Sequence, residues 1–248
     1  MSSFFSLKRI NRIHSIATKI HKEASFIVIL PAYNVAKFLR KTLIDLRKVS
    51  TVNSNVVVVD DGSTDGTIED IEGFNLILLK HKKNTGKGSA LKTGFRYAIE
   101  HGFSHAIVLD ADYQHDPNQI SFFLDAVKNG NYDLVIGTRE LTLRSFPIDR
   151  YFSNKLSSLI LSLICNYRVK DSQCGFRLIN LNMLKKLNLY SDHYELESEL
   201  LIKFAKSNAT IVQIPISTRL SNGISHIRRS LDTVRFFIML CRTISYGS

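Results

Sequence analysis

Short apolar runs alternate with amphipathic segments between residues 25 and 137. Each run is rich in Val, Ile and Leu and is about as long as one strand. Between the runs, apolar positions recur every three or four residues, which predicts helices that bury one face. The predicted strands are Phe26–Leu30, Val56–Val59, Asn75–Leu79, Ala106–Leu109 and Leu134–Ile136. The predicted helices are Leu39–Val49 with Asn34 as its cap, a short stretch ending near Glu72, Gly88–His101 and Asn118–Lys128.

Uninterrupted apolar strands that alternate with helices are typical of a mostly parallel sheet covered on both faces. The fold class expected is therefore α/β, with ligands bound beyond the carboxyl ends of the strands. After Gly137 the alternation weakens, and no linker divides the chain, so residues 25–227 are predicted to form one domain with a C-terminal elaboration. In that part we expect helices at Pro147–Cys165, Glu195–Ser207 and 230–245, and strands at Phe176–Ile179 and Thr210–Ile216.

Both ends of the chain carry basic amphipathic patterns. In residues 1–24 the helical stripe is formed by Leu7, Ile10, Ile13, Ala17 and Ile20, with Lys and Arg between them. In residues 228–248 it is formed by Leu231, Val234, Phe237, Ile238 and Cys241, flanked by four arginines. Such helices lie on an anionic membrane surface or pack on their own domain or a dimer partner.

The composition narrows the choice of protein class. The chain has 248 residues, 44% of them hydrophobic, and a formal net charge of +11. This excludes a disordered chain, and no apolar run reaches the roughly 18 residues of a membrane span. Three cysteines without metal-ligand spacing indicate reduced thiols. We expect a cytoplasmic protein, peripheral on the cytoplasmic face of a membrane, with anionic partners but no nucleic acid.

Adjacent acids, Asp60 and Asp61, end the second predicted strand. From Asp61 to Glu72 the spacing nearly matches a calcium-binding loop of the EF-hand type. Such a loop follows a helix, however, whereas this one follows four valines. We therefore favour a strand-to-helix turn whose carboxylates accept hydrogen bonds from a nucleobase or ribose.

A second acidic motif follows the fourth predicted strand. Asp110 and Asp112 are separated by one residue, so both can turn toward one site, where a cation would offset their repulsion. Oxygen ligands suit Mg²⁺ or Mn²⁺ shared with a substrate phosphate, and Gln114 can add an amide oxygen. The sequence predicts a divalent metal held by these three residues.

Basic residues complete the predicted electrostatics. Residues 84–88 form neither a phosphate-binding loop nor a dinucleotide fingerprint, but Lys87 opens a helix where an anion can bind. Arg139 follows the fifth strand, and Arg150, Arg177 and Arg219 lie downstream. A leaving diphosphate needs its developing charge neutralised by such groups.

Together these motifs resemble the family 2 glycosyltransferases, in particular the dolichyl- and polyprenyl-phosphate mannose and glucose synthases. The resemblance covers residues 26–227 and implies a GT-A fold, a nucleotide-sugar donor, a divalent metal and inversion at the anomeric carbon. It rests on Pro31-Ala-Tyr-Asn34, Asp60–Gly66, Asn84–Ala90, Asp110–Pro117 and Gly137-Thr-Arg139, with Asp171–Arg177 and Glu197–Leu201 closer to the glucosyl branch.

The resemblance also implies roles for individual residues. The nucleoside pocket would be lined by Pro31, Tyr33, Asp60 and Asp61. The metal would be held by Asp110, Asp112 and Gln114, and the donor would also contact Lys87 and Ala111. Phosphates of donor or acceptor would be bound by Arg139, Arg150 and Arg219.

The function expected is transfer of a hexose from a UDP-glucose or GDP-mannose type of donor to a polyprenyl or dolichyl phosphate or to a glycan hydroxyl. A phosphate acceptor is already an anion and needs orientation only, whereas a hydroxyl needs a general base. Glu197 and Glu199 are candidates for that base, although Glu199 is also spaced to pair with Lys203 along a helix. Two other classes remain open: a nucleotidyltransferase acting on a sugar phosphate, and a non-enzymatic module that binds calcium or anionic lipid.

Overall fold

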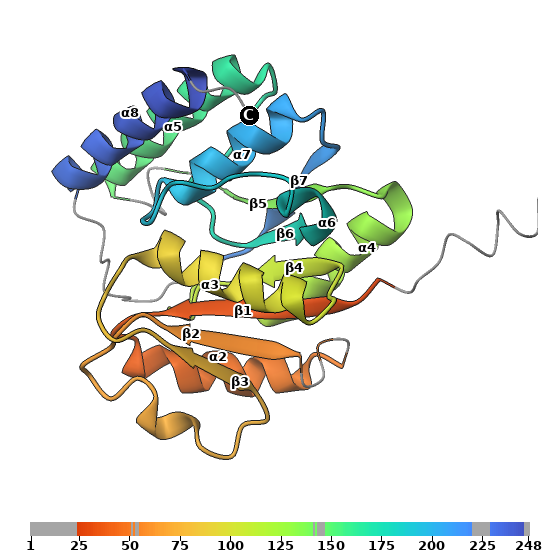
Figure 1. Ribbon diagram of the computed structural model, residues 1–248, viewed down its shortest axis with the longest axis vertical. Coiled ribbons are helices and arrows are strands. Elements are labelled where there is room, and N and C mark those ends of the chain that lie inside the picture. Colours follow the sequence, from red (N-terminus) through yellow and green to blue (C-terminus); the bar gives the residue numbers. More distant parts are fainter. Residues whose placement is uncertain are drawn as a thin grey trace, which may run out of the picture.

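The protein folds around one seven-stranded sheet with helices on both faces (Figure 1). The computed structural model describes residues 24–50, 52, 55–140, 142, 147–219 and 229–245. The strands are β1 (Phe26–Ala32), β2 (Val56–Asp60), β3 (Ile77–Lys80), β4 (His105–Val108), β5 (Leu134–Arg139), β6 (Arg177–Asn180) and β7 (Ile211–Ile216). The helices are α2 (Ala36–Lys48), α3 (Lys87–Glu100), α4 (Ile120–Gly130), α5 (Ile148–Cys165), α6 (Leu181–Leu184), α7 (Leu196–Lys206) and α8 (Arg229–Ser245), with 3₁₀ turns η1 (Glu69–Ile71) and η2 (Pro117–Gln119).

The sheet is mostly parallel, as the apolar strands predict. The strand order is β3-β2-β1-β4-β6-β5-β7, and β6 alone among them runs antiparallel to both of its neighbours. Successive side chains of a strand point to opposite faces, so each strand contributes to two cores. Ile27 and Ile29 of β1 pack with α3 and α7, whereas Val28 and Leu30 pack with α2 and α4.

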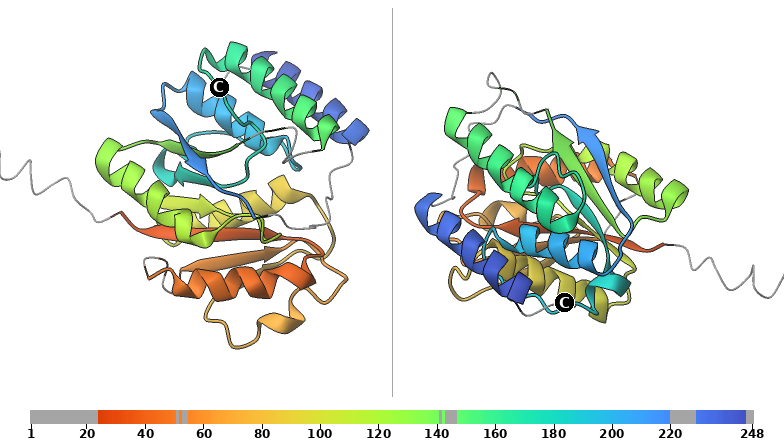
Figure 2. Two further views of the ribbon diagram at one scale, coloured as in Figure 1. Left: turned by 180° about the vertical axis from the view of Figure 1, so that it is seen from behind. Right: turned by 90° about the horizontal axis from the view of Figure 1, so that it is seen from above.

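Two helices form an outer layer on the α7 side of the sheet. Both α5 and α8 pack against α7, and Figure 2 shows them beyond it, on the side away from β1 and α2. The predicted helix at 230–245 is thus confirmed as α8, while the predicted helix at 1–24 lies outside the described residues. Among the described residues, no helix combines the length and hydropathy needed to cross a bilayer.

One local prediction is wrong, and a second is borne out only as a 3₁₀ turn. Asn34 does not cap α2, because it adopts a positive φ of 52° and its side chain accepts a hydrogen bond from Thr64. The backbone N–H groups that open α2 are satisfied instead by the loop that follows β2, where Asp65 and Thr67 accept hydrogen bonds from Ala36 and Val35. With its side chains used in this way, the loop forms only the 3₁₀ turn η1 where a helical stretch was expected.

Candidate active site

The predicted site residues gather at one edge of the sheet. Pro31 and Ala32 end β1 and lie beside Val59 and Asp60 at the end of the parallel strand β2. β4 is the other neighbour of β1 and also runs parallel to it, so residues 110–112 follow at the same edge. Tyr33, half-buried, comes directly after β1. Topology therefore brings together motifs that lie far apart in the sequence.

Asp61 is a structural anchor beneath this edge. It is buried and accepts hydrogen bonds from the Thr85 backbone and hydroxyl at 3.0 and 2.7 Å and from the Gly86 backbone at 2.7 Å. Its carboxylate also lies 2.7 Å from His81 Nδ1. Because these bonds fix the segment before α3, Asp61 holds Lys87 in place. The carboxylate of the neighbouring Asp60 accepts a hydrogen bond from Ser63.

The calcium hypothesis for this loop does not fit the structure. Asp61 points to the segment before α3, whereas the Ser63 hydroxyl accepts a hydrogen bond from Asn34 and Asp65 caps α2. The side chains that an EF-hand loop would direct to one ion are therefore committed to separate parts of the protein. The loop is thus a turn that follows β2 and braces α2, while the expected hydrogen bonds from its carboxylates to a nucleobase or ribose stay a prediction.

Lys87 lies between two carboxylates at the start of α3. Its ammonium is 2.6 Å from Asp110 Oδ1 and 2.9 Å from Glu197 Oε1. Burial opposes the charge on Lys87, but the two carboxylates outweigh burial and raise its pKa. Burial likewise acts against ionised Asp110, yet the charges of Lys87 and its other neighbours hold the pKa of Asp110 below its usual range. Both groups are therefore charged at neutral pH.

At Asp112 the surroundings disfavour the charged form, in contrast to Asp110. Burial and the neighbouring charge of Asp110 raise the pKa of Asp112 to about 6. Its Oδ1 accepts a hydrogen bond from the Gln114 backbone at 3.0 Å, which closes the loop around the intervening Tyr113. Ala111 is buried in the core and anchors this loop. Residues 110–114, which we call the acidic loop, therefore have a fixed backbone and one carboxylate, that of Asp112, whose ionised form is disfavoured.

The donor set fits a divalent cation. Asp110 and Glu197 both contact the Lys87 ammonium, and Asp112 lies close enough to Asp110 for the two charges to repel, so a divalent cation would stabilise both ionised aspartates. The absence of a side chain at Gly175 leaves room for this arrangement, because a Cβ there would lie 2.3 Å from Asp110 Oδ2. No group of three or more His, Cys, Asp or Glu in the described part of the chain forms a complete metal cage. An ion held here would accordingly also need oxygens from a substrate.

Arg139 is held beside this edge by an acid that the sequence motifs did not single out as a site residue. Its Nε and Nη2 donate to the two oxygens of Asp171 at 2.7 and 3.0 Å, and Asn154 of α5 donates to the same carboxylate at 2.7 Å. Burial opposes the charge on Arg139, but Asp171 outweighs it and raises its pKa. The guanidinium is thus fixed in a charged state at the end of β5. Arg177, in contrast, is fully buried and donates to backbone carbonyls of residues 172, 174 and 197.

The other two predicted arginines differ in their surroundings. Arg219 forms ion pairs with Asp45 of α2 at 2.8 Å and with Asp116 at 3.0 Å, and its guanidinium lies 4.3 Å above the Tyr113 ring. It therefore braces the acidic loop. Arg150 lies half-buried in the first turn of α5.

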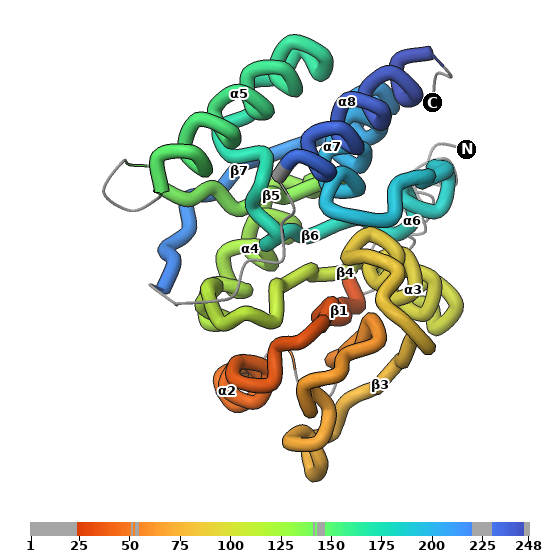
Figure 3. The backbone as a smooth tube through the Cα atoms, turned by 90° about the vertical axis from the view of Figure 1, so that its left-hand side faces the viewer, coloured from red at the N-terminus to blue at the C-terminus, as the bar shows by residue number. Residues whose placement is uncertain are grey.

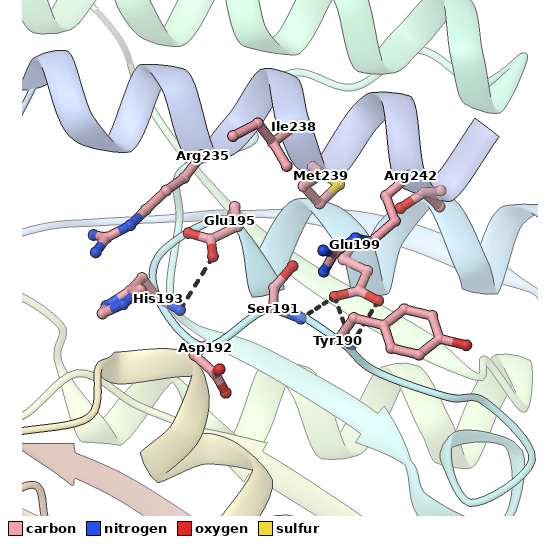
Figure 4. Close-up of a pocket in the computed structure, with 11 residues that line it drawn as sticks. Tyr190, Ser191, Asp192, His193, Glu195, Glu199, Arg235, Ile238, Met239 and Arg242 are labelled. Carbon is pink, nitrogen blue, oxygen red and sulfur yellow. Dashed lines mark hydrogen bonds between the residues drawn. The ribbon is translucent and has the colours of Figure 1, made fainter. Parts of the chain in front are cut away.

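Glu199 has the structural role that its spacing from Lys203 suggested. The two side chains form a buried ion pair at 2.9 Å, and Glu199 also accepts hydrogen bonds from the backbone of Tyr190 and Ser191 (Figure 4). A cavity of about 200 Å³ lies between this loop and α8, and neither Asp110 nor Asp112 lines it. This geometry favours the structural alternative over a general base. Glu197, two residues earlier in α7, faces Lys87 instead.

One buried polar group beside the acidic loop was not anticipated. His115 is 3% exposed, and its Nδ1 has no hydrogen-bond partner among the described residues. Burial lowers the pKa of His115 to about 4, so the ring is neutral. The motif Asp110–Pro117 contained His115, but nothing in its spacing distinguishes a buried imidazole from a solvated one.

Comparison with known proteins finds similar glycosyltransferases. A UDP-N-acetylglucosamine–dolichyl-phosphate N-acetylglucosaminyltransferase of Methanococcus voltae is 32% identical over 77% of this chain and 84% of its own length. An undecaprenyl-phosphate mannosyltransferase of Micrococcus luteus is 30% identical over 77% of this chain and 82% of its own.

The fold also matches a solved enzyme structure. Glucosyl-3-phosphoglycerate synthase from Mycobacterium tuberculosis, in complex with Mn²⁺, UDP and glucosyl-3-phosphoglycerate, superposes with a TM-score of 0.69. The match covers 91% of this chain and 82% of the other at 17% identity, and it shows the GT-A fold. The family model described as glycosyl transferase family 2 matches residues 27–187. The chain is therefore a glycosyltransferase and belongs to family 2.

Proposed function

We propose that this enzyme transfers a hexose from a nucleotide sugar to the phosphate of a polyprenyl lipid, with inversion at the anomeric carbon. The observation that carries the proposal is the Asp110–Asp112 pair at the carboxyl end of β4, with Lys87 on one side. The names of the relatives from Methanococcus and Micrococcus support a lipid-phosphate acceptor, and the first of them also supports a UDP-linked sugar as donor.

Asp110 and Asp112 would hold Mg²⁺ or Mn²⁺, with Gln114 as a further oxygen ligand. When bound, the ion supplies positive charge to the diphosphate of the donor. The nucleoside would lie against Pro31, Tyr33 and Asp60, which stand at or just after the ends of β1 and β2. Asp61 has a supporting role, because its hydrogen bonds fix the segment that leads to Lys87.

The transfer is a single displacement. An oxygen of the lipid phosphate forms a bond to the anomeric carbon, and the bond from that carbon to the donor diphosphate breaks. Its electron pair leaves with the nucleoside diphosphate, whose added charge Lys87 is placed to stabilise. Arg139, held by Asp171, is placed at the end of β5 to orient an acceptor phosphate.

The surroundings of the two glutamates support a phosphate acceptor over a glycan hydroxyl. Glu199 is paired with Lys203, and Glu197 lies 2.9 Å from Lys87. Each of the two carboxylates therefore already contacts a cation of the protein itself. Because a phosphate is already ionised, it needs no proton acceptor, and Arg139 and Lys87 then suffice for binding and orientation.

Incubation with radiolabelled UDP- or GDP-sugars, Mn²⁺ and a polyprenyl phosphate tests the proposal. We expect label in the lipid extract and release of nucleoside diphosphate, with Asp112→Asn at least about 100-fold slower. Asp125→Asn, an exposed acid on α4, is the matched control and should retain full activity. Release of pyrophosphate would indicate a nucleotidyltransferase instead, and label on a glycan alone would overturn the lipid acceptor.

A further inference from the structure

Helix α5 has an inverted distribution of polar and apolar side chains. Its buried face includes Asn154 and Ser158, which hydrogen bond to Asp171 and Ser172. Its outer face is a stripe of large apolar side chains at spacings of three and four residues. Each of them is between 58% and 76% exposed: Ile148, Phe152, Leu156, Leu159 and Leu163. A surface helix in water normally buries such a stripe.

Helix α8 extends the exposed apolar surface. It packs on α7 through its inner side, where Met239 and Leu240 are buried. Figure 3 shows α5 and α8 side by side as the outermost layer above α7. We define the α5–α8 face as the stripe on α5 together with the exposed apolar residues of α8, which are Leu231, Val234, Phe237, Ile238 and Ile244. Exposed apolar side chains gathered on two neighbouring outer helices mark an interaction site.

The charged residues around the face are mainly basic. Beside the stripe on α5 and just after the helix lie Arg150, Lys155, Arg168 and Lys170, against the single acid Asp149. On α8, Asp232 pairs with Arg235, and Arg242 adds a further positive charge. Two copies of this face would bring like charges together, whereas anionic lipid headgroups complement them.

We propose that the α5–α8 face rests in the headgroup region of an anionic bilayer, with its apolar side chains in the upper part of the acyl chains. No described helix is built to span the membrane, so this is attachment to one surface. The inference rests on the proposed function in one respect: a lipid-phosphate acceptor brings the enzyme to a bilayer. The attachment itself requires no catalysis.

The inner side of α5 connects this face to the active site. Asn154 donates to Asp171 at 2.7 Å, and the same carboxylate binds Arg139 through both of its oxygens. A helix that rests on the bilayer therefore sets the position of the arginine proposed to orient the acceptor phosphate. Attachment through α5 would hold Arg139 at a constant depth relative to the headgroups.

Vesicle flotation of the full-length protein tests the proposal. The vesicles contain phosphatidylcholine with or without phosphatidylglycerol, and no polyprenyl phosphate. We expect binding to the anionic vesicles, reduced about tenfold or more in the double variant Phe152→Ser/Leu159→Ser. The matched control is Ile44→Ser/Phe122→Ser, which removes exposed apolar side chains from α2 and α4 on the opposite face of the sheet and should bind like the wild type.

Three results would overturn the proposal: unchanged binding by the α5 variant, equal loss in the control, or a wild-type dimer in sedimentation that only the α5 substitutions dissociate. The last would identify a second copy as the occupant. Thermal unfolding confirms that each variant is folded. Transfer to a short-chain, water-soluble polyprenyl phosphate separates the two proposals, because the α5 variant should keep that activity. Vesicle binding without any transfer would refute the proposed function alone.

Discussion

The hydroxyl of Tyr113 donates a hydrogen bond to Asp45 Oδ2 across 3.0 Å, which ties the acidic loop to helix α2. Tyr113 stands between Asp112 and Gln114 and has a positive φ of 64°, a conformation that costs a non-glycine residue about 1 kcal/mol. Arg219 completes the brace, because it pairs with Asp45 and stacks on the Tyr113 ring. The strained turn next to Asp112 is thus held in place by Asp45 of α2, which lies 68 residues earlier in the sequence than Tyr113.

Tyr113→Phe should weaken this brace without removing the ring. Loss of one hydrogen bond predicts a decrease of about 1 kcal/mol in the free energy of unfolding, measured in urea. Because the turn positions Asp112, we also expect a lower apparent affinity for Mn²⁺ in the transfer assay. The control Tyr97→Phe removes a hydroxyl from α3 and should leave the Mn²⁺ dependence unchanged. An unaltered Mn²⁺ titration in Tyr113→Phe would contradict the positioning role.

Lys87→Met should make the protein more dependent on a divalent cation for stability. Without the ammonium, Asp110 and Glu197 lose the cation between them in a partly buried site, which predicts a loss of about 2 kcal/mol. Added Mn²⁺ should restore more stability to this variant than to the wild type, as measured by urea unfolding with and without the ion. Lys92→Met is the control, since its ion pair with Asp192 is partly exposed and contributes less than about 1 kcal/mol. Equal effects of Mn²⁺ on variant and wild type would show that the ion binds elsewhere.

The fold and the position of the site could be predicted because local patterns encode them. Continuous apolar runs such as residues 27–30 require cover on both faces, which is the signature of parallel strands. Acids placed directly after β2 and β4 then meet at one edge, since parallel strands end together. The antiparallel direction of β6 could not be predicted in this way, because a buried strand has the same local pattern whether it runs parallel or antiparallel to its neighbours.

The partners of the site residues could not be predicted from the sequence. Asp171 holds Arg139 from 32 positions away, and Asp45 holds Arg219 from 174 positions away. Neither pair has a periodic spacing, so only the packed fold reveals it. Glu199 is instructive in another way: its spacing from Lys203 suggested an ion pair, but its burial depends on the loop at residues 190–191.

Gly175→Ala should separate metal binding from folding. The new Cβ would lie 2.3 Å from Asp110 Oδ2, and the flexible end of that side chain is what would have to move. We therefore expect a loss of at most about 1 kcal/mol in stability, since only one side chain is displaced. Mn²⁺-dependent binding of a nucleotide sugar, measured by calorimetry, should weaken about tenfold or more, because an ion site depends on ligand geometry. Wild-type affinity in this variant would show that Asp110 is not a ligand.

Acid should remove the stabilising effect of Glu199. Burial alone would raise the pKa of Glu199, but hydrogen bonds from Lys203, Ser191 and Tyr190 outweigh it and hold the pKa below the ordinary value of 4.5. The ionised form therefore stabilises the fold above about pH 4.5, and this contribution is lost as the pH falls through the lower pKa of the folded state. Glu199→Gln, which leaves Lys203 without its carboxylate, should cost about 3 kcal/mol at neutral pH.

The gap in unfolding free energy between wild type and Glu199→Gln should accordingly shrink as the pH falls from neutral to about 3. Glu100→Gln is the control, because Glu100 is exposed at the end of α3 and its substitution should change stability by less than about 0.5 kcal/mol at any pH. Urea unfolding of the three proteins across this range measures both gaps. A gap for Glu199→Gln that stays constant down to acid pH would contradict this prediction. It would mean that Glu199 stabilises the fold through its shape and packing, and that the ion pair between its charge and Lys203 adds nothing.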